Sequence, residues 1–257
     1  MTTRKHGGGP LPQFLALAAL GWLALGGAGC ATPGPLHVYS LATAGDERTV
    51  RDTGDGRTTD VPSFLEPDEV VSGFAYDPFT DHFFLRLDPG NRIRVVDRPA
   101  RAIKREFDIE GKPEIGGGDL AVRPRDGHLF LLKASSSEVL ETSRLGKTVR
   151  AFALAGVSVA PVAIAIDPLR DRLLILNADA RHITVHDLQG ARTADITLAE
   201  PAGSSLAYDP EKREMYAPLR NRPGQIGVFD EAGKLLRSEP SAGPLMDVGV
   251  RSFVRVF

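Results

Sequence analysis

The sequence predicts an all-β fold, a β-propeller built of four-stranded blades, and two observations support this prediction. First, a short apolar strand that ends in Asp-Pro or Arg-Pro recurs four times, with its alanine at Ala75, Ala121, Ala165 and Ala207. Second, each copy is followed by another apolar run, a polar gap, an alternating strand and a charged strand. Four short strands in every 42–46 residues are the signature of a propeller blade.

Each strand of the repeat has a predicted place in its blade. The first strand, as in residues 74–76 and 164–166, is apolar throughout because neighbouring blades cover both of its faces. The second strand, such as residues 83–85, is also apolar, and the third alternates, as in residues 226–230. The fourth strand, such as residues 147–152, carries charge because it forms the exposed edge.

The two ends of the chain together supply one more blade. Residues 246–250 and 253–256 match the first two strands of a repeat, and residues 36–40 and 47–51 match the third and fourth. We therefore expect five blades, closed by pairing N- and C-terminal strands in one of them. They comprise residues 245–257 with 36–52, then 73–110, 118–155, 162–198 and 204–239. The remaining stretch, residues 53–72, is either a long loop or a degenerate strand pair that would raise the count to six.

The repeat resembles the NHL and YVTN-like propeller repeats of bacterial envelope proteins. The matching residues are the LAYDP strand at 206–210 and the IxVFD strand with its following Gly-Lys at 226–234. The resemblance covers nearly all of residues 36–257, although six blades are commonest in that group. It implies the fold, and it leaves open whether the protein is a scaffold, a ligand binder or an enzyme.

The N-terminal segment has the three parts of a secretory signal. Residues 1–10 carry Arg4 and Lys5 and no acid, residues 11–25 are almost wholly apolar, and small residues precede Cys30. Cys30 is the only cysteine, so it forms no internal disulfide.

This segment resembles the lipobox of bacterial lipoproteins, although Gly27 stands where the box usually has Leu. The resemblance implies that Cys30 is lipidated and becomes the mature N-terminus. It divides the chain into a signal peptide at 1–29, a short tether at 30–35 and the propeller at 36–257. Two other interpretations remain: a retained membrane anchor, for which 15 apolar residues are short, and ordinary secretion with a free Cys30.

Lipidation predicts a protein of the bacterial cell envelope, anchored to the membrane through Cys30 and paired with an envelope protein partner. Ala31, rather than Asp, after the cysteine favours the outer membrane. Without residues 1–29 the chain keeps 29 basic and 33 acidic residues, a formal charge of −4. This near balance gives a nucleic-acid partner no electrostatic support, and we expect no cofactor.

The aspartates of the Asp-Pro turns, Asp77, Asp167 and Asp209, are expected to be structural, accepting backbone N–H groups in the turn. Two other carboxylates break the repeat near the central channel. Asp119 precedes an inner strand, and Asp247 replaces the alanine of the other four blades.

Propeller hydrolases resembling gluconolactonase hold a divalent cation in the channel with Glu, Asn and Asp oxygens. In this chain no Glu or Asn stands at the matching places, so the alternative is that Asp119 caps a strand end and Asp247 is solvated or salt-bridged. His182 and His186 lie on a predicted strand without a third ligand, so we expect no metal there.

The leading functional hypothesis is a non-enzymatic, membrane-anchored propeller that acts as a binding platform. The alternatives are a metal-assisted hydrolase or lactonase that uses Asp119 and Asp247, and a binder of a small ligand.

Overall fold

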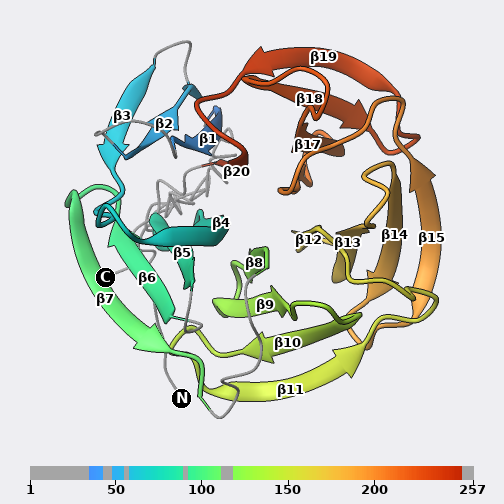
Figure 1. Ribbon diagram of the computed structural model, residues 1–257, viewed down its shortest axis with the longest axis horizontal. Coiled ribbons are helices and arrows are strands. Elements are labelled where there is room, and N and C mark those ends of the chain that lie inside the picture. Colours follow the sequence, from blue (N-terminus) through green and yellow to red (C-terminus); the bar gives the residue numbers. More distant parts are fainter. Residues whose placement is uncertain (1–34, 43–47, 55–57, 89–91, 111–117, 251–257) are drawn as a thin grey trace, which may run out of the picture. The chain divides into compact units, whose positions relative to one another are not determined.

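The computed structural model describes residues 35–42, 48–54, 58–88, 92–110 and 118–250 of the chain. In these residues, twenty strands form five antiparallel sheets of four strands each. The sheets are blades around a central axis, with one strand of each blade innermost (Figure 1). The predicted five-bladed propeller is therefore confirmed. The described residues contain no helix with the length and apolarity that a bilayer crossing requires.

Four blades consist of consecutive strands, each named here from the innermost outward. The first two are β4 (Val70–Asp77), β5 (His82–Asp88), β6 (Arg92–Asp97) and β7 (Ala102–Asp108), then β8 (Leu120–Arg123), β9 (His128–Leu132), β10 (Glu138–Thr142) and β11 (Thr148–Ala153). The next two are β12 (Ala163–Asp167), β13 (Arg172–Leu176), β14 (His182–Asp187) and β15 (Arg192–Thr197), then β16 (Ala207–Asp209), β17 (Glu214–Pro218), β18 (Gln225–Asp230) and β19 (Leu235–Pro240).

The fifth blade joins the two ends of the chain, as expected. Its innermost strand is β20 (Leu245–Val250), which pairs along its whole length with β1 (Leu36–Leu41). The strands β2 (Thr49–Asp52) and β3 (Thr59–Pro62) complete the sheet. Hydrogen bonds between the two chain ends thus close the ring, and β1 is paired on both sides, with β20 and with β2.

The division of this blade between the two ends differs from the expectation. The N-terminal side supplies three strands rather than two, and the segment at 47–51 lies third, not fourth, in the sheet. The fourth strand, Thr59–Pro62, comes from the stretch 53–72, so the six-bladed alternative is wrong. Pro62 is tolerated there because an edge strand does not need every N–H, and Val61 is buried against the aromatic core. The expected strand at 253–256 lies outside the described residues.

The innermost strands follow one another around the axis in a closed circle, β4, β8, β12, β16 and β20. The blades pack face to face through apolar side chains, and the seam between the closing blade and its neighbour is aromatic. There the Tyr39 ring centroid lies 4.4 Å from that of Tyr76 and 5.0 Å from that of Phe83. Each such ring pair contributes about 0.5–1.5 kcal/mol beyond its buried area, so this seam strengthens the closure.

Burial along the strands follows the prediction from the sequence. Every residue of the inner strand β12 is buried, whereas the outer strand β7 is mostly exposed. The inner strand is covered on both faces by neighbouring blades, and the outer strand faces solvent at the rim.

Asp-Pro turns follow three of the inner strands, β4, β12 and β16. Asp77, Asp167 and Asp209 accept the backbone N–H of the residue two positions on, at 3.0, 3.1 and 3.0 Å. The structural role predicted for these three carboxylates is confirmed. We call the end of the ring that carries these turns the turn face, and the other end the opposite face.

Candidate functional site

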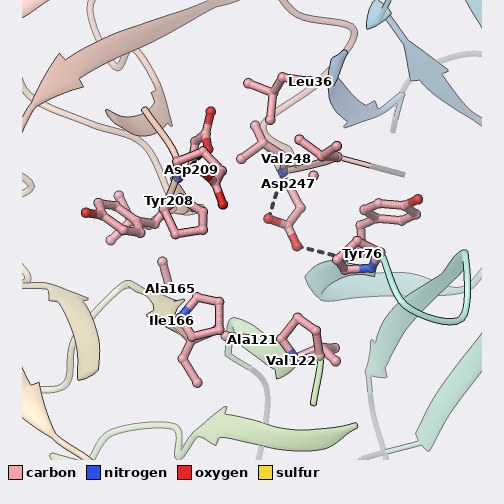
Figure 2. Close-up of a pocket in the computed structure, with 18 of the residues that line it drawn as sticks. Leu36, Tyr76, Ala121, Val122, Ala165, Ile166, Tyr208, Asp209, Asp247 and Val248 are labelled. Carbon is pink, nitrogen blue, oxygen red and sulfur yellow. Dashed lines mark hydrogen bonds between the residues drawn. The ribbon is translucent and has the colours of Figure 1, made fainter. Parts of the chain in front are cut away.

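A cavity of about 190 Å³ occupies the central channel and opens at the turn face. Residues from all five inner strands line it, and Figure 2 shows their side chains converging on the axis. The lining is mainly aliphatic and aromatic, and four prolines from the repeated turns surround its mouth: Pro78, Pro124, Pro168 and Pro210. Leu36, the first residue of β1, also lines it. The cavity is therefore an apolar space with few polar groups.

Among the described residues, three carboxylates line the cavity, those of Asp209, Glu211 and Asp247, and Asp247 lies on the inner strand β20. Its Oδ2 accepts the backbone N–H of Tyr76 from β4 at 2.7 Å, and its Oδ1 accepts the N–H of Val248 at 2.8 Å (Figure 2). Both donors belong to inner strands, whose channel-side edges have no further strand to pair with. The carboxylate thus satisfies backbone groups that the fold leaves open.

Burial of Asp247 in this narrow space raises its pKa to about 7, against the opposing effect of the two backbone N–H groups. A carboxyl group with such a pKa changes charge near neutral pH. The sequence led us to expect Asp247 to be solvated or salt-bridged. Among the described residues it forms no salt bridge, and its side chain instead bonds to backbone N–H groups.

Asp119 occupies a different place from Asp247. It precedes β8 at the opposite-face end of the strand, is 1% exposed, and does not line the cavity of the turn face. Its Oδ2 accepts the backbone N–H of Ile164 in the next blade at 3.1 Å, while Oδ1 is buried without a hydrogen-bond partner among the described residues. Burial raises the pKa of Asp119 well above its usual range, and the nearby charge of Asp247 acts in the same direction.

The two carboxylates lie on different blades and share no hydrogen-bond partner among the described residues, although the charge of Asp247 reaches Asp119. Each reaches across a blade boundary, Asp119 to Ile164 and Asp247 to Tyr76. Ser205 occupies the same position of the repeat as Asp119 and makes the same kind of link. Its Oγ donates to the carbonyl of Met246 at 2.8 Å and accepts the Met246 N–H at 3.2 Å.

Sequence reasoning did not single out Ser205, nor did it single out Arg86. Arg86 is fully buried, and its Nη1 donates to the carbonyls of Gly118 at 3.0 Å and Leu132 at 2.7 Å, both in the next blade. Burial lowers its pKa to about 10, so it stays charged at neutral pH. An arginine inside an otherwise apolar second strand, between Leu85 and Leu87, is the sequence signal that could have identified it.

The two histidines on β14 do not converge. His182 bonds through Nδ1 to the nearby Asp179, at the exposed end of the strand. His186 is buried, with Nδ1 near the Gly190 carbonyl at 3.0 Å and Nε2 near Thr184 Oγ1 at 2.9 Å. In the part of the chain that the structure describes, no three His, Cys, Asp or Glu side chains gather as a metal site would need.

A second cavity, of about 430 Å³, opens at the opposite face beside Glu69, Val70 and Leu245. Glu69 accepts from two arginines of β6, Arg92 at 2.5 Å and Arg94 at 2.6 Å. These ion pairs fix the segment between β3 and β4 against β6 of the blade β4–β7, so the charges here hold the chain in place.

Comparison with known proteins gives the fold and no family. No model of a known protein family matches the chain, and no curated protein matches it in sequence.

Three solved structures resemble the chain at low sequence identity. A nidogen/laminin complex matches with a TM-score of 0.56 and 13% identity, over 84% of this chain and 98% of that chain. Glutaminyl cyclase of Myxococcus xanthus matches with a TM-score of 0.53 and 14% identity, over 68% of this chain and 72% of that one. Hydrazine synthase of Kuenenia stuttgartiensis matches with a TM-score of 0.47 and 14% identity, over 69% of this chain and about half, 51%, of that one. At these identities the likeness extends to the propeller fold alone.

Proposed function

We propose that this chain is a lipid-anchored protein of the bacterial cell envelope whose propeller is a non-enzymatic binding platform. The anchor is assigned to Cys30, which follows a charged, an apolar and a small-residue segment. A single acyl chain binds membranes only marginally, so firm attachment at Cys30 takes more than one chain or a second signal.

The observation that supports the platform hypothesis is that the two channel carboxylates bond to the backbone of neighbouring blades. Asp119 and Asp247 both accept backbone N–H groups of the following blade. Carboxylates that hold a ring together are poorly placed to move during a reaction, because each displacement would leave a buried N–H without an acceptor. The arrangement favours a rigid ring that presents its surfaces to other molecules.

The position where the chain enters the ring adds a geometric element to the proposal. Leu36 pairs with Val250 at the turn face, and the tether between Cys30 and β1 comprises only residues 31–35. Five residues reach about 17 Å at most when extended. A lipidated Cys30 would therefore keep the turn face close to the bilayer and leave the opposite face available to envelope proteins.

The anchor is tested by the intact mass of the protein purified from a bacterial membrane fraction, with Cys30→Ser in parallel. We expect a mature chain that starts at Cys30 and carries acyl groups, and a mutant that has lost both the acyl mass and membrane attachment. An unmodified, soluble product cut near residue 30 would refute the anchor.

The platform is tested by crosslinking in intact cells, followed by mass spectrometry of the recovered complexes. We expect an envelope protein to be crosslinked through the opposite face. Turnover of a small substrate by the purified protein, with no partner recovered, would refute the platform in favour of an enzyme.

A second candidate function, binding or hydrolysis of a small molecule, is favoured by the apolar cavity and by Asp247 beside it. A metal-assisted hydrolase predicts that calcium, zinc or manganese raises the melting temperature, because a ligand that binds only the folded state stabilises it. Loss of that shift in Asp247→Asn would support a cavity site. Equal melting temperatures with and without each ion would exclude the metal-assisted form.

A further inference from the structure

We propose that the turn face docks directly on an anionic phospholipid bilayer. This inference deepens the proposed function and rests on it, since the lipid on Cys30 would bring the turn face to the membrane. The described chain begins at Pro35 beside the mouth of the cavity, where Leu36 lies opposite Val250. A tether of five residues, which reaches about 17 Å at most, would hold the turn face near the bilayer.

The exposed apolar side chains are concentrated on the turn face. Of the eight large hydrophobic residues exposed in the described chain, six lie in its turns or at the second residue of an outer strand, next to those turns: Phe79, Ile103, Leu145, Val149, Leu169 and Leu236. Phe79, Leu145 and Leu169 project from turns and are 63%, 63% and 66% exposed. The other two, Val70 and Val159, lie at the opposite face.

Exposed charged residues also differ between the two faces: basic ones predominate on the turn face and acidic ones on the opposite face. In the turns of the turn face and the first two residues of the outer strands, eight exposed residues are basic: Arg101, Arg125, Lys147, Arg170, Arg192, Lys212, Arg213 and Lys234. Two exposed residues there are acidic, Asp60 and Glu211. At the opposite face the balance is reversed among the described residues, with five exposed acids, Glu66, Asp68, Asp108, Glu110 and Asp179, against Arg181 and Arg220.

Half of the basic side chains on the turn face lack an acidic partner. Arg125, Arg170, Arg192 and Arg213 form ion pairs with neighbouring carboxylates. Within the described residues, Arg101, Lys147, Lys212 and Lys234 have no ion-pair partner. Their positive charge is therefore available to a negatively charged surface outside the protein, which anionic lipid headgroups supply.

Apolar and basic side chains on one face are the combination that binds a lipid surface. The apolar groups enter the boundary between headgroups and acyl chains, and the basic groups interact with anionic headgroups. Stable anchoring commonly requires an acyl chain together with a second signal such as a basic patch. The turn face would supply this second signal, beside the tether that carries the first.

The test measures binding of the chain from residue 31 onward, which lacks Cys30, to sedimented vesicles. Residues 33–257 form a compact unit of their own that contains all five sheets, so this chain retains the propeller. We expect it to bind vesicles that contain phosphatidylglycerol and to bind vesicles of phosphatidylcholine alone much more weakly. Binding is expected to weaken from about 0.1 M to about 1 M salt, as the screening length falls from about 10 to about 3 Å.

Matched charge reversals locate the binding face. Lys147→Glu with Lys234→Glu is expected to lower partitioning by about 25-fold or more, since each basic residue near an anionic surface contributes roughly a fivefold factor and each substitution also adds a negative charge. Arg181→Glu with Arg220→Glu changes the net charge equally but at the opposite face, and is expected to leave partitioning within about twofold, because screening weakens distant charges. Phe79→Ser with Leu169→Ser removes apolar contacts and should also weaken binding, including at high salt.

The vesicle results separate this inference from the lipid anchor. If Cys30 is acylated but the chain without it does not bind anionic vesicles, the anchor stands and the docking face is wrong. Equal losses from the two charge-reversal pairs would likewise overturn the assignment of the face. If the turn face instead crosslinks to an envelope protein while vesicles are not bound, that face is a protein interface and not a lipid one.

Discussion

The carboxylate of Asp247 accepts the backbone N–H of Tyr76 at 2.7 Å, which joins residues 171 positions apart in the sequence. Asp247 lies on β20, supplied by the C-terminal end of the chain, and Tyr76 lies on β4 of the next blade. The bond therefore lies on the seam where the ring closes. It supplements the pairing of β20 with β1 and connects the closing blade to its neighbour.

The titration of Asp247 makes stability depend on pH. Its pKa is about 7 in the folded protein, against an ordinary value of 3.8, so the folded state binds a proton more tightly than the unfolded state does. This contribution is fully present below about pH 4 and is lost as the pH rises toward about 7, by at most about 4 kcal/mol.

Urea denaturation at a series of pH values between these limits measures this effect. Asp247→Asn cannot titrate, so its stability is expected to fall less steeply with pH than that of the wild type. An unchanged slope in the mutant would show that other groups, Asp119 among them, produce the dependence.

Ser205→Ala is expected to destabilise the propeller by about 1–3 kcal/mol, because a buried N–H and carbonyl of Met246 lose their partner. The loss should be visible in urea denaturation as a lower midpoint with an unchanged slope. Ser204→Ala is the matched control, because that neighbouring side chain is exposed. Equal effects of the two substitutions would contradict a role for the link between blades.

Arg86→Met is expected to destabilise by about 3 kcal/mol or more, because it removes a buried cation that donates to Gly118 and Leu132 and leaves both carbonyls without that donor. Arg86→Lys keeps the charge but not the planar fork of donors, so partial loss is expected. Thermal unfolding of the three proteins measures the series. A methionine variant as stable as the wild type would show that the carbonyls find other partners.

Two glycines allow the cost of an unusual backbone conformation to be distinguished from the cost of a steric clash. Gly233 and Gly224 have similar positive φ values, 81° and 80°. A Cβ at Gly233 would lie 2.1 Å from the carbonyl oxygen of Thr197, whereas at Gly224 the nearest atom is 4.0 Å away. Gly224→Ala should therefore cost about 1–2 kcal/mol for its left-handed conformation, and Gly233→Ala clearly more. Equal losses of melting temperature would show that the turn at Gly233 shifts to relieve the contact.

The architecture could be predicted because each blade repeats one local pattern. The apolar inner strands, the charged outer strands and the Asp-Pro turns follow from alternation and turn chemistry, which act over a few residues. The prediction was wrong for the closing blade, where Thr59–Pro62 forms its outermost strand. That strand is short, contains Asp60 and Pro62, and lacks the sequence pattern of the other outer strands, so its place is set by its pairing with β2.

The candidate site could be predicted only as a set of residues. Asp119 and Asp247 were identified because they break the repeat, but the sequence does not reveal that the first bonds to Ile164 and the second to Tyr76. Both links cross a blade boundary, and the partner of a side chain there depends on how adjacent blades are rotated.

The repeat, the strand order within most blades and the joining of the two chain ends could be predicted from the sequence, because they depend on periodic, local patterns. The count of five rather than six blades required the structure, which places Thr59–Pro62 in the closing blade. The structure was needed to show that Asp247 and not Asp119 lines the cavity, what each carboxylate bonds to, and that the exposed basic and apolar residues share one face. Residues such as Phe79, Lys147 and Lys234 come from different blades, and the closed ring brings their turns to the same end. The charge and apolarity of this face arise from residues far apart in the sequence, so no regular spacing along the chain reveals them.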